Sequence, residues 1–155
     1  MKITTGIDII EVDRIEKAIE ELGTNFLNRI YTENEIKYCN NTKKMKYQHY
    51  AARFAVKEAV FKAISEYIDG RTDDLWKDIE VINKKSGKPA INVERLRENL
   101  RKNADKEIKI QDIDISISHI DKYAIANVVV VLDNWKEEPW DFLIHMPIIM
   151  MRNLI

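Results

Sequence analysis

The chain has 155 residues, a length that favours a single domain. Hydrophobic residues make up 45% of it and charged residues 33%, with only 4 Gly and 3 Pro, which excludes a disordered, collagenous or Pro/Gly-rich protein. The 25 Lys and Arg and the 26 Asp and Glu give a formal net charge of −1. A general polyanion binder carries a large basic excess, so we expect no nucleic-acid partner.

The single cysteine, Cys39, cannot form a disulfide within one chain, and the N-terminal residues MKITTGID lack the charged start and apolar run of a signal peptide. We therefore expect a cytoplasmic protein. The longest nearly apolar stretch, Phe142 to Met151, has ten residues and is broken by His145 and Pro147. A membrane helix needs about 20 apolar residues, so we expect no membrane span.

The first strand is predicted at residues 2–10, which alternate so that four side chains share one face: Ile3, Thr5, Ile7 and Ile9. Asp8 lies on the opposite face, away from the isoleucines. Asp13 and Glu16 have the spacing of a capping box, and the amphipathic pattern that follows predicts a helix that ends at Gly23.

The helical segments continue with an apolar turn at residues 26–30 and a second capping-box pair, Thr32 and Glu35. A polar loop is expected at residues 40–44. Residues 46–68 carry the longest helical pattern and are apolar over much of the circumference, so this helix should be central to the fold. One side of it offers close approach through small residues: Ala52, Ala55, Ala59 and Ala63.

Two β-hairpins are predicted after a polar loop at residues 69–74. The first spans residues 79–93 and turns at Ser86-Gly87-Lys88-Pro89, and the second lies within residues 113–132. A further amphipathic helix over residues 93–100 separates them. This order lacks regular strand-helix-strand alternation, so we expect an α+β fold with mainly antiparallel strands around the long central helix.

Three charged residues could carry chemistry. Glu58 projects from or beside the apolar stripe of the central helix, where a carboxylate needs a partner. Lys62 follows at i+4, so the two could form only an exposed helix ion pair worth about 0.2–0.5 kcal/mol. Asp8 could likewise be a solvated strand residue. Together, Asp8 and Glu58 could instead form a two-carboxylate oxygen site of the kind that Mg²⁺ prefers when phosphates complete its shell.

The remaining candidate residues are less specific. His119 ends an alternating strand, where a histidine is more often structural or solvated than catalytic. Several basic residues could simply lie on wet faces: Arg53, Lys57, Lys62 and Lys88. The sequence contains no P-loop, no Gly-x-Gly-x-x-Gly and no Gly-x-Ser-x-Gly, which disfavours an ordinary NTPase, dinucleotide enzyme or hydrolase. No His/Cys cluster indicates zinc.

Five motifs occur in order: GIDIIEVDRI at 6–15, RIYTENE at 29–35, ARFAVKEAVFKA at 52–63, SGKP at 86–89 and ISISH at 115–119. In this order and spacing the chain resembles the holo-[acyl-carrier-protein] synthases, the small bacterial type of 4'-phosphopantetheinyl transferase. The resemblance covers residues 3 to about 132. It implies one transferase domain over residues 1–132 and a C-terminal extension over residues 133–155.

The resemblance implies transfer of the 4'-phosphopantetheine group from coenzyme A to a serine hydroxyl of apo-acyl carrier protein, with release of adenosine 3',5'-bisphosphate. An alcohol then attacks a pyrophosphate phosphorus, a reaction that needs charge neutralisation and a base. The family implies Asp8 and Glu58 as Mg²⁺ ligands. It further implies that Glu58, directly or through water, takes the serine proton and that Lys62 offsets charge on the phosphates.

The resemblance also implies binding residues and an assembly. The residues expected to contact coenzyme A are Arg53, Gly87, Lys88, Pro89 and His119. Those expected to face the acidic helix of acyl carrier protein are Arg14, Lys17 and Arg29. A local basic face can steer an acidic partner even at a net charge of −1. The family implies a homotrimer whose active sites lie between neighbouring subunits, which periodicity alone does not indicate.

The extension over residues 133–155 has neither a helical nor a strand period and holds two of the three Trp. It could pack onto the body, cover a neighbouring subunit or offer a partner surface. Two other functions stay open for the whole chain. A non-catalytic module that binds carrier protein is disfavoured by the charged set Asp8, Glu58 and Lys62, and a larger transferase of secondary metabolism is disfavoured because 155 residues leave no room for two fused halves.

Overall fold

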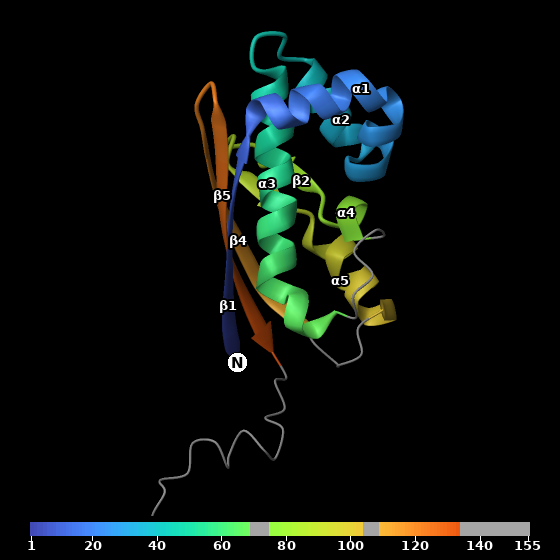
Figure 1. Cartoon of the computed structure of the whole chain (residues 1–155). Coiled ribbons are helices and arrows are strands. Elements are labelled where there is room, and N and C mark those ends of the chain that lie inside the picture. Colours follow the sequence, from blue (N-terminus) through green and yellow to red (C-terminus); the bar gives the residue numbers. More distant parts are fainter. Residues whose placement is uncertain (69–74, 104–108, 134–155) are drawn as a thin grey trace, which may run out of the picture.

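The computed structural model describes residues 1–68, 75–103 and 109–133 (Figure 1). Its elements follow one another as β1 (Lys2–Glu11), α1 (Val12–Ile30), α2 (Glu33–Asn40), α3 (Lys46–Ile64), a 3₁₀ turn η1 (Ser65–Tyr67), α4 (Leu75–Asp78), β2 (Val81–Asn83), β3 (Pro89–Ile91), α5 (Val93–Asn103), β4 (Lys109–His119) and β5 (Tyr123–Asp133). The expected α+β class, with antiparallel strands and a long central helix, is confirmed.

The main sheet has three antiparallel strands in the order β1-β5-β4. Figure 1 shows the helices gathered on one face of this sheet, with α3 lying along it. β5 explains this packing, because its side chains alternate between exposed and buried over its whole length. The buried set contacts α3 and consists of Ala124, Ala126, Val128, Val130 and Leu132. The core therefore lies between one sheet face and α3.

β1 presents its isoleucines to the outer face of the sheet. Ile3, Ile7 and Ile9 are 58%, 57% and 62% exposed. Gly6 is buried on the other face, toward α3. The predicted division of this strand into two faces is confirmed, and the face that carries Gly6 and Asp8 is the one that packs against the central helix.

The helix signals at the N-terminal half were partly correct. The capping box at Thr32 and Glu35 is present, with the hydroxyl and the carboxylate each accepting from the other residue's backbone N–H. The predicted capping box at Asp13 is wrong, because α1 begins at Val12 after an N-cap residue, Glu11, that makes no side-chain cap bond. Gly23 interrupts α1 with a φ of 57°. After it the helix continues to Ile30, where we expected only a short apolar turn.

The first predicted hairpin is shorter than expected. β2 and β3 pair over only three residues each, from Val81↔Ile91 to Asn83↔Pro89, and Val93 begins α5 instead of ending a strand. The second hairpin, β4 with β5, is confirmed and extends to Asp133. The predicted loop at residues 69–74 and the extension after Asp133 lie outside the described residues. No described helix is long and apolar enough to cross a membrane.

Candidate functional site

Gly6 brings β1 into direct contact with α3. A Cβ on Gly6 would overlap the backbone carbonyl of Ala59, so only glycine permits this separation. Asp8 lies two residues further along the same face of β1, because strand side chains alternate. On α3, Glu58 and Lys62 are one turn apart, and each immediately precedes an alanine, Ala59 or Ala63. The close approach at Gly6 thus sets Asp8 opposite the only acidic residue of α3.

Lys62 links the strand to the helix. Its Nζ donates to Oδ1 of Asp8 at 2.8 Å and to the backbone carbonyl of Ile7 at 3.1 Å. The Asp8 side chain is 15% exposed and that of Lys62 is 50% exposed. The lysine therefore reaches a sheltered carboxylate from a position open to solvent, instead of forming only a surface pair with Glu58.

Glu58 is half-buried beside these two residues. Burial raises the pKa of its carboxyl group, the negative charge of Asp8 raises it further, and the positive charge of Lys62 opposes both effects. Two carboxylates that repel each other in a half-buried place favour a cation between them. Asp8, Glu58 and Lys62, three residues singled out from the sequence, therefore form one charged site.

A second cluster surrounds the N-terminal half of α3. Arg53 is 4% exposed, its Nη2 donates to Oδ1 of Asn83 at 3.0 Å, and its guanidinium lies 4.0 Å from the ring centroid of Tyr38. The ring of His49 lies 5.3 Å from Tyr38 and 5.7 Å from His119, centroid to centroid. Arg53 and His119, both predicted from the sequence, thus belong to one cluster that connects α2, α3, β2 and β4.

The turn between β2 and β3 is tied to this cluster. Gly87 adopts a φ of 84°, and its carbonyl accepts from Nδ2 of Asn83 at 3.2 Å. Asn83 therefore joins Arg53 to the turn through its two amide atoms. Lys88 leaves the turn to form an ion pair with Asp114 of β4 at 2.7 Å, and the following Pro89 begins β3.

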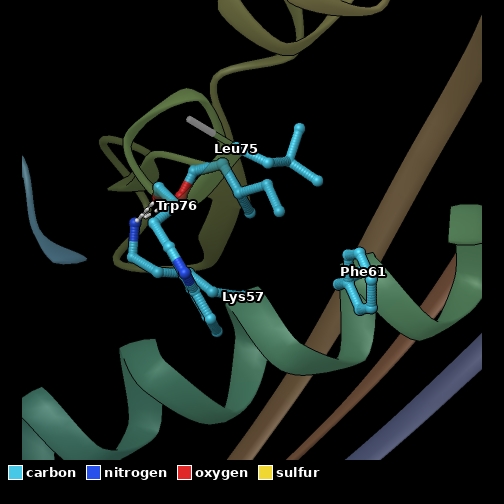
Figure 2. Close-up of a pocket in the computed structure, with 5 residues that line it drawn as sticks. Lys57, Phe61, Leu75 and Trp76 are labelled. Atoms are coloured by element: carbon cyan, nitrogen blue, oxygen red, sulfur yellow. Dashed lines mark hydrogen bonds between the residues drawn. The ribbon is translucent and has the colours of Figure 1, made fainter. Parts of the chain in front are cut away.

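A small pocket opens between α3 and α4 and is lined by Lys57, Phe61, Leu75, Trp76 and Ile79 (Figure 2). Figure 2 shows Lys57 extending from α3 to the backbone beside Trp76, where its Nζ donates to the carbonyls of Trp76 and Ile79 at 2.6 Å each. Phe61 lines the pocket three residues after Glu58.

Lys57 is fully buried, so the expectation that it lies on a wet helix face is wrong. It pairs with Glu35 at 2.9 Å, and both side chains are 0% exposed. Glu35 also accepts from the backbone N–H groups of Thr32 and Val81 at 2.9 and 3.0 Å. These charge-assisted hydrogen bonds join Glu35 of α2 to Lys57 of α3 and to the backbone at the start of β2, so the buried pair holds the three elements together. Sequence reasoning found the capping role of Glu35 but missed the buried lysine.

The basic residues of α1 are at its surface. Arg14, Lys17 and Arg29 are all exposed, on either side of the interruption at Gly23. They alternate with acidic residues in the same helix, which fits the nearly neutral charge of the whole chain. Among the described residues, none of the three forms a hydrogen bond or an ion pair with Asp8 or Glu58.

The model of one protein family matches residues 4–128, and its description is the 4'-phosphopantetheinyl transferase superfamily. The chain belongs to this superfamily. It is 41% identical over 139 residues to a holo-[acyl-carrier-protein] synthase of Ruminiclostridium cellulolyticum, an alignment that covers 89% of this chain and 99% of the relative. A second such synthase, from Thermoanaerobacter sp., is 39% identical over 131 residues and is covered to 88%.

Solved structures of phosphopantetheinyl transferases share the fold. The holo-(acyl-carrier-protein) synthase of Bacillus anthracis in complex with CoA (3',5'-ADP) is 35% identical, with a TM-score of 0.61 and coverage of 82% of this chain and 94% of the other. The enzyme of Helicobacter pylori in complex with coenzyme A is 32% identical, with a TM-score of 0.62 and coverage of 82% and 99%. The resemblance inferred from five motifs is confirmed.

Within this transferase fold, the predicted residues fall into two groups along α3. Asp8, Glu58 and Lys62 form the first, and the cluster of Arg53 and His119 forms the second. Arg53 and Lys62 are nine residues apart in one helix, which corresponds to about 13 Å along its axis at 1.5 Å per residue. Sequence reasoning missed His49 and Asn83, for which no motif or spacing gave a signal.

Proposed function

We propose that this protein transfers the 4'-phosphopantetheine group from coenzyme A to a serine hydroxyl of apo-acyl carrier protein, giving holo-acyl carrier protein and adenosine 3',5'-bisphosphate. The observation that carries the proposal is the charged site of Asp8, Glu58 and Lys62, with two carboxylates and one ammonium at the contact of β1 with α3. The names and ligands of the related synthases support the same activity.

Magnesium is the cofactor that we propose for this site. The donor set fits it, because Asp8 and Glu58 supply hard oxygen ligands and repel each other when both are ionised. Among the described residues no group of three or more His, Cys, Asp and Glu could hold a metal by itself. Two protein carboxylates, completed by substrate phosphates and water, are typical of Mg²⁺. When bound, the ion would supply charge neutralisation at the pyrophosphate.

The residues of the chain supply the rest of the chemistry. Glu58 accepts the proton of the attacking serine hydroxyl. Its raised pKa makes it a stronger base than an ordinary carboxylate. Lys62 holds a positive charge beside the phosphate from which the bisphosphate departs. Its exposed ammonium can leave Asp8 for a phosphate oxygen without breaking a buried bond, since half of the side chain already faces solvent.

Coenzyme A binding is assigned to the second group. Arg53 and His119 offer cationic or hydrogen-bonding groups to the phosphates of the nucleotide, and the exposed turn Gly87-Lys88-Pro89 offers a surface to the same molecule. Lys88 would exchange Asp114 for a phosphate. Both side chains of this ion pair are at least half exposed, so the exchange costs little.

Acyl carrier protein is the proposed macromolecular partner. Arg14 and Lys17 on the first part of α1, together with Arg29 near its end, present positive charge to an acidic helix. Rim charges of this kind mainly raise the association rate and set the orientation of the partner. The binding should therefore weaken with added salt.

A homotrimer is the proposed assembly, with the outer face of the sheet as the contact. That face exposes a set of apolar side chains on two adjacent strands: Ile3, Ile7, Ile9, Tyr123, Ile125 and Val129. Monomeric proteins rarely leave so many large apolar side chains together in water. A neighbouring copy that covered them would remove this apolar surface from water.

The first test is the intact mass of purified apo-acyl carrier protein after incubation with this protein, coenzyme A and Mg²⁺, with a chelated sample as control. A metal-dependent gain of one phosphopantetheine group is the expected result. No gain with several carrier proteins, from a folded sample that still binds them, would replace the transferase by a non-catalytic binding module. Light scattering of the purified protein alone measures its molar mass in solution, and three times the mass of one chain is expected for the trimer.

A further inference from the structure

His49 lies at the centre of the second cluster, although no sequence motif includes it. Its half-buried ring has Tyr38 of α2 at 5.3 Å and His119 of β4 at 5.7 Å, centroid to centroid. The planes of the two imidazoles meet at 75°, an edge-to-face contact. Such ring pairs contribute beyond the area that they bury. His49 therefore connects α3 to His119 of β4 by a ring contact.

A hydrogen bond fixes the orientation of the His49 ring. Its Nδ1 lies 2.8 Å from Oγ1 of Thr42, and this hydroxyl is also 3.2 Å from the carbonyl of Cys39. The tautomer of His49 decides which of the two atoms donates, and either tautomer makes this hydrogen bond. With the ring held by Thr42 on one side, its contact with His119 has a defined geometry.

The guanidinium of Arg53 is fixed in the same cluster. It donates to Asn83, stacks over the ring of Tyr38 and approaches the backbone carbonyl of His49 at 3.5 Å through Nη1. Its Nε is buried and, among the described residues, has no hydrogen-bond partner. A buried donor without a partner costs free energy. The cluster thus combines an immobilised cation with two imidazoles.

Charge supports a neutral role for His49. Burial lowers its pKa, and the nearby positive charges of Arg53 and His119 lower it further. At neutral pH the ring is uncharged and does not repel a cation beside it. His49 then need only hold the His119 ring in place.

We propose that His49 is a positioning residue for coenzyme A, which acts through His119: its ring, held by Thr42, fixes the His119 imidazole next to Arg53 so that the two can bind the phosphates of the nucleotide half. The inference rests on the proposed transferase function. It adds a residue on α3 whose contribution to nucleotide affinity depends on the presence of His119, and it assigns no contact with the substrate to His49 itself.

The test measures the affinity of the full chain for adenosine 3',5'-bisphosphate by calorimetry, together with the KM for coenzyme A and kcat. His49→Ala should raise Kd and KM about 2- to 10-fold, the range that corresponds to one aromatic contact, with a smaller change in kcat. His49→Phe keeps the ring contact but loses the hydrogen bond to Thr42, so its Kd should lie between those of the parent and of His49→Ala. Gln48→Ala, a neighbouring change on α3, is the matched control.

The decisive comparison uses a His119→Ala background. There, His49→Ala should have no further effect on Kd, because its target is gone. The inference would be overturned if the two substitutions raised Kd independently, so that their fold-changes multiplied in the double variant. It would also be overturned by an unchanged Kd in His49→Ala or in His119→Ala, or by a parent protein that does not bind the bisphosphate. Phosphopantetheine transfer by the parent protein is scored separately by mass. Transfer with any of these binding results retains the proposed function and discards the role of His49.

Discussion

The ammonium of Lys62 lies 2.8 Å from the carboxylate of Asp8, across the contact between α3 and β1. The lysine also donates to the carbonyl of Ile7, so two groups of one strand hold its position. Glu58 stands one helical turn before it. Removal of the lysine would leave two carboxylates without their nearest positive charge, which makes Lys62 the residue whose loss should change the electrostatics of the site most.

Lys62→Ala should reduce turnover more than it reduces the binding of carrier protein. The ammonium offsets charge that develops on the phosphates during transfer, and such groups contribute about 2.7–4 kcal/mol to catalysis when a single donor is removed. Initial rates by mass spectrometry, compared with carrier-protein affinity from titration, separate the two effects. Equal losses in turnover and in affinity would show that the residue only supports the structure.

Glu58→Gln should abolish most of the activity and leave the fold intact. The amide has nearly the same shape but cannot accept the serine proton, and loss of a general base lowers rates about 10²- to 10⁴-fold. Glu94→Gln, which alters an 84% exposed carboxylate on α5, is the matched control. A fully active Glu58→Gln protein with unchanged metal dependence would remove both roles from this residue.

The sequence predicted the strands of the main sheet and the central helix because their patterns are strong, but not the pairing of β1 with β5. β5 alternates over eleven residues and α3 is apolar over much of its circumference, so few other structures suit these segments. The start of α1 was predicted wrongly because Asp13 and Glu16 have cap spacing inside a helix that already begins at Val12. Cap signals are local, whereas the strand that runs into α1 determines where the helix starts.

The residues of the charged site were predicted from the sequence through the family motifs. Their geometry depends on Gly6, which has no functional group but lets β1 approach α3. Spacing alone left Glu58 and Lys62 as an ordinary helix pair, since nothing local shows that β1 crosses α3 at Gly6. The buried pair of Glu35 and Lys57 was missed for the same reason. A lysine in a helix is usually solvated, and only tertiary packing brings a buried carboxylate to it.

Gly6→Ala should destabilise the protein and also lower its activity. The added Cβ would overlap the carbonyl of Ala59, a backbone atom that cannot move aside, and overpacking costs about 1–3 kcal/mol or more. Because β1 must shift away from α3, Asp8 would lose its position opposite Glu58. Urea unfolding and transfer rates measure both effects. Asn28→Ala, at an exposed position of α1, should change neither.

Lys57→Met should lower the free energy of unfolding by about 3–5 kcal/mol, the usual cost of removing one partner from a buried ion pair. Glu35 would stay buried with only backbone donors, and two carbonyls, those of Trp76 and Ile79, would lose their donor. Denaturant unfolding measures the loss. Lys77→Met, on the neighbouring α4, is the control for lysine removal, and an equally small change in both variants would contradict a stabilising role of the pair.

The stability of the protein should decrease on mild acidification, in part because of His49. Its pKa is lowered from 6.5 in the folded protein by burial and by the charges of Arg53 and His119, but has its ordinary value in the unfolded chain. As the pH falls below about 6.5, the unfolded chain takes up a proton that the folded protein still resists. The unfolded state then binds more protons, so the free energy of unfolding falls until the pH reaches the folded pKa.

His49→Phe removes this titration and keeps the aromatic contact with His119, so it should lose less stability than the parent between about pH 7.5 and about pH 5.5. Urea unfolding at the two pH values and one fixed protein concentration measures the difference, since assembly makes stability depend on concentration. The comparison of slopes, rather than of absolute stability, isolates the imidazole from any change in packing. Equal slopes for parent and variant would mean that His49 titrates alike in the folded and unfolded states, which would contradict the burial of its ring among Tyr38, Arg53 and His119.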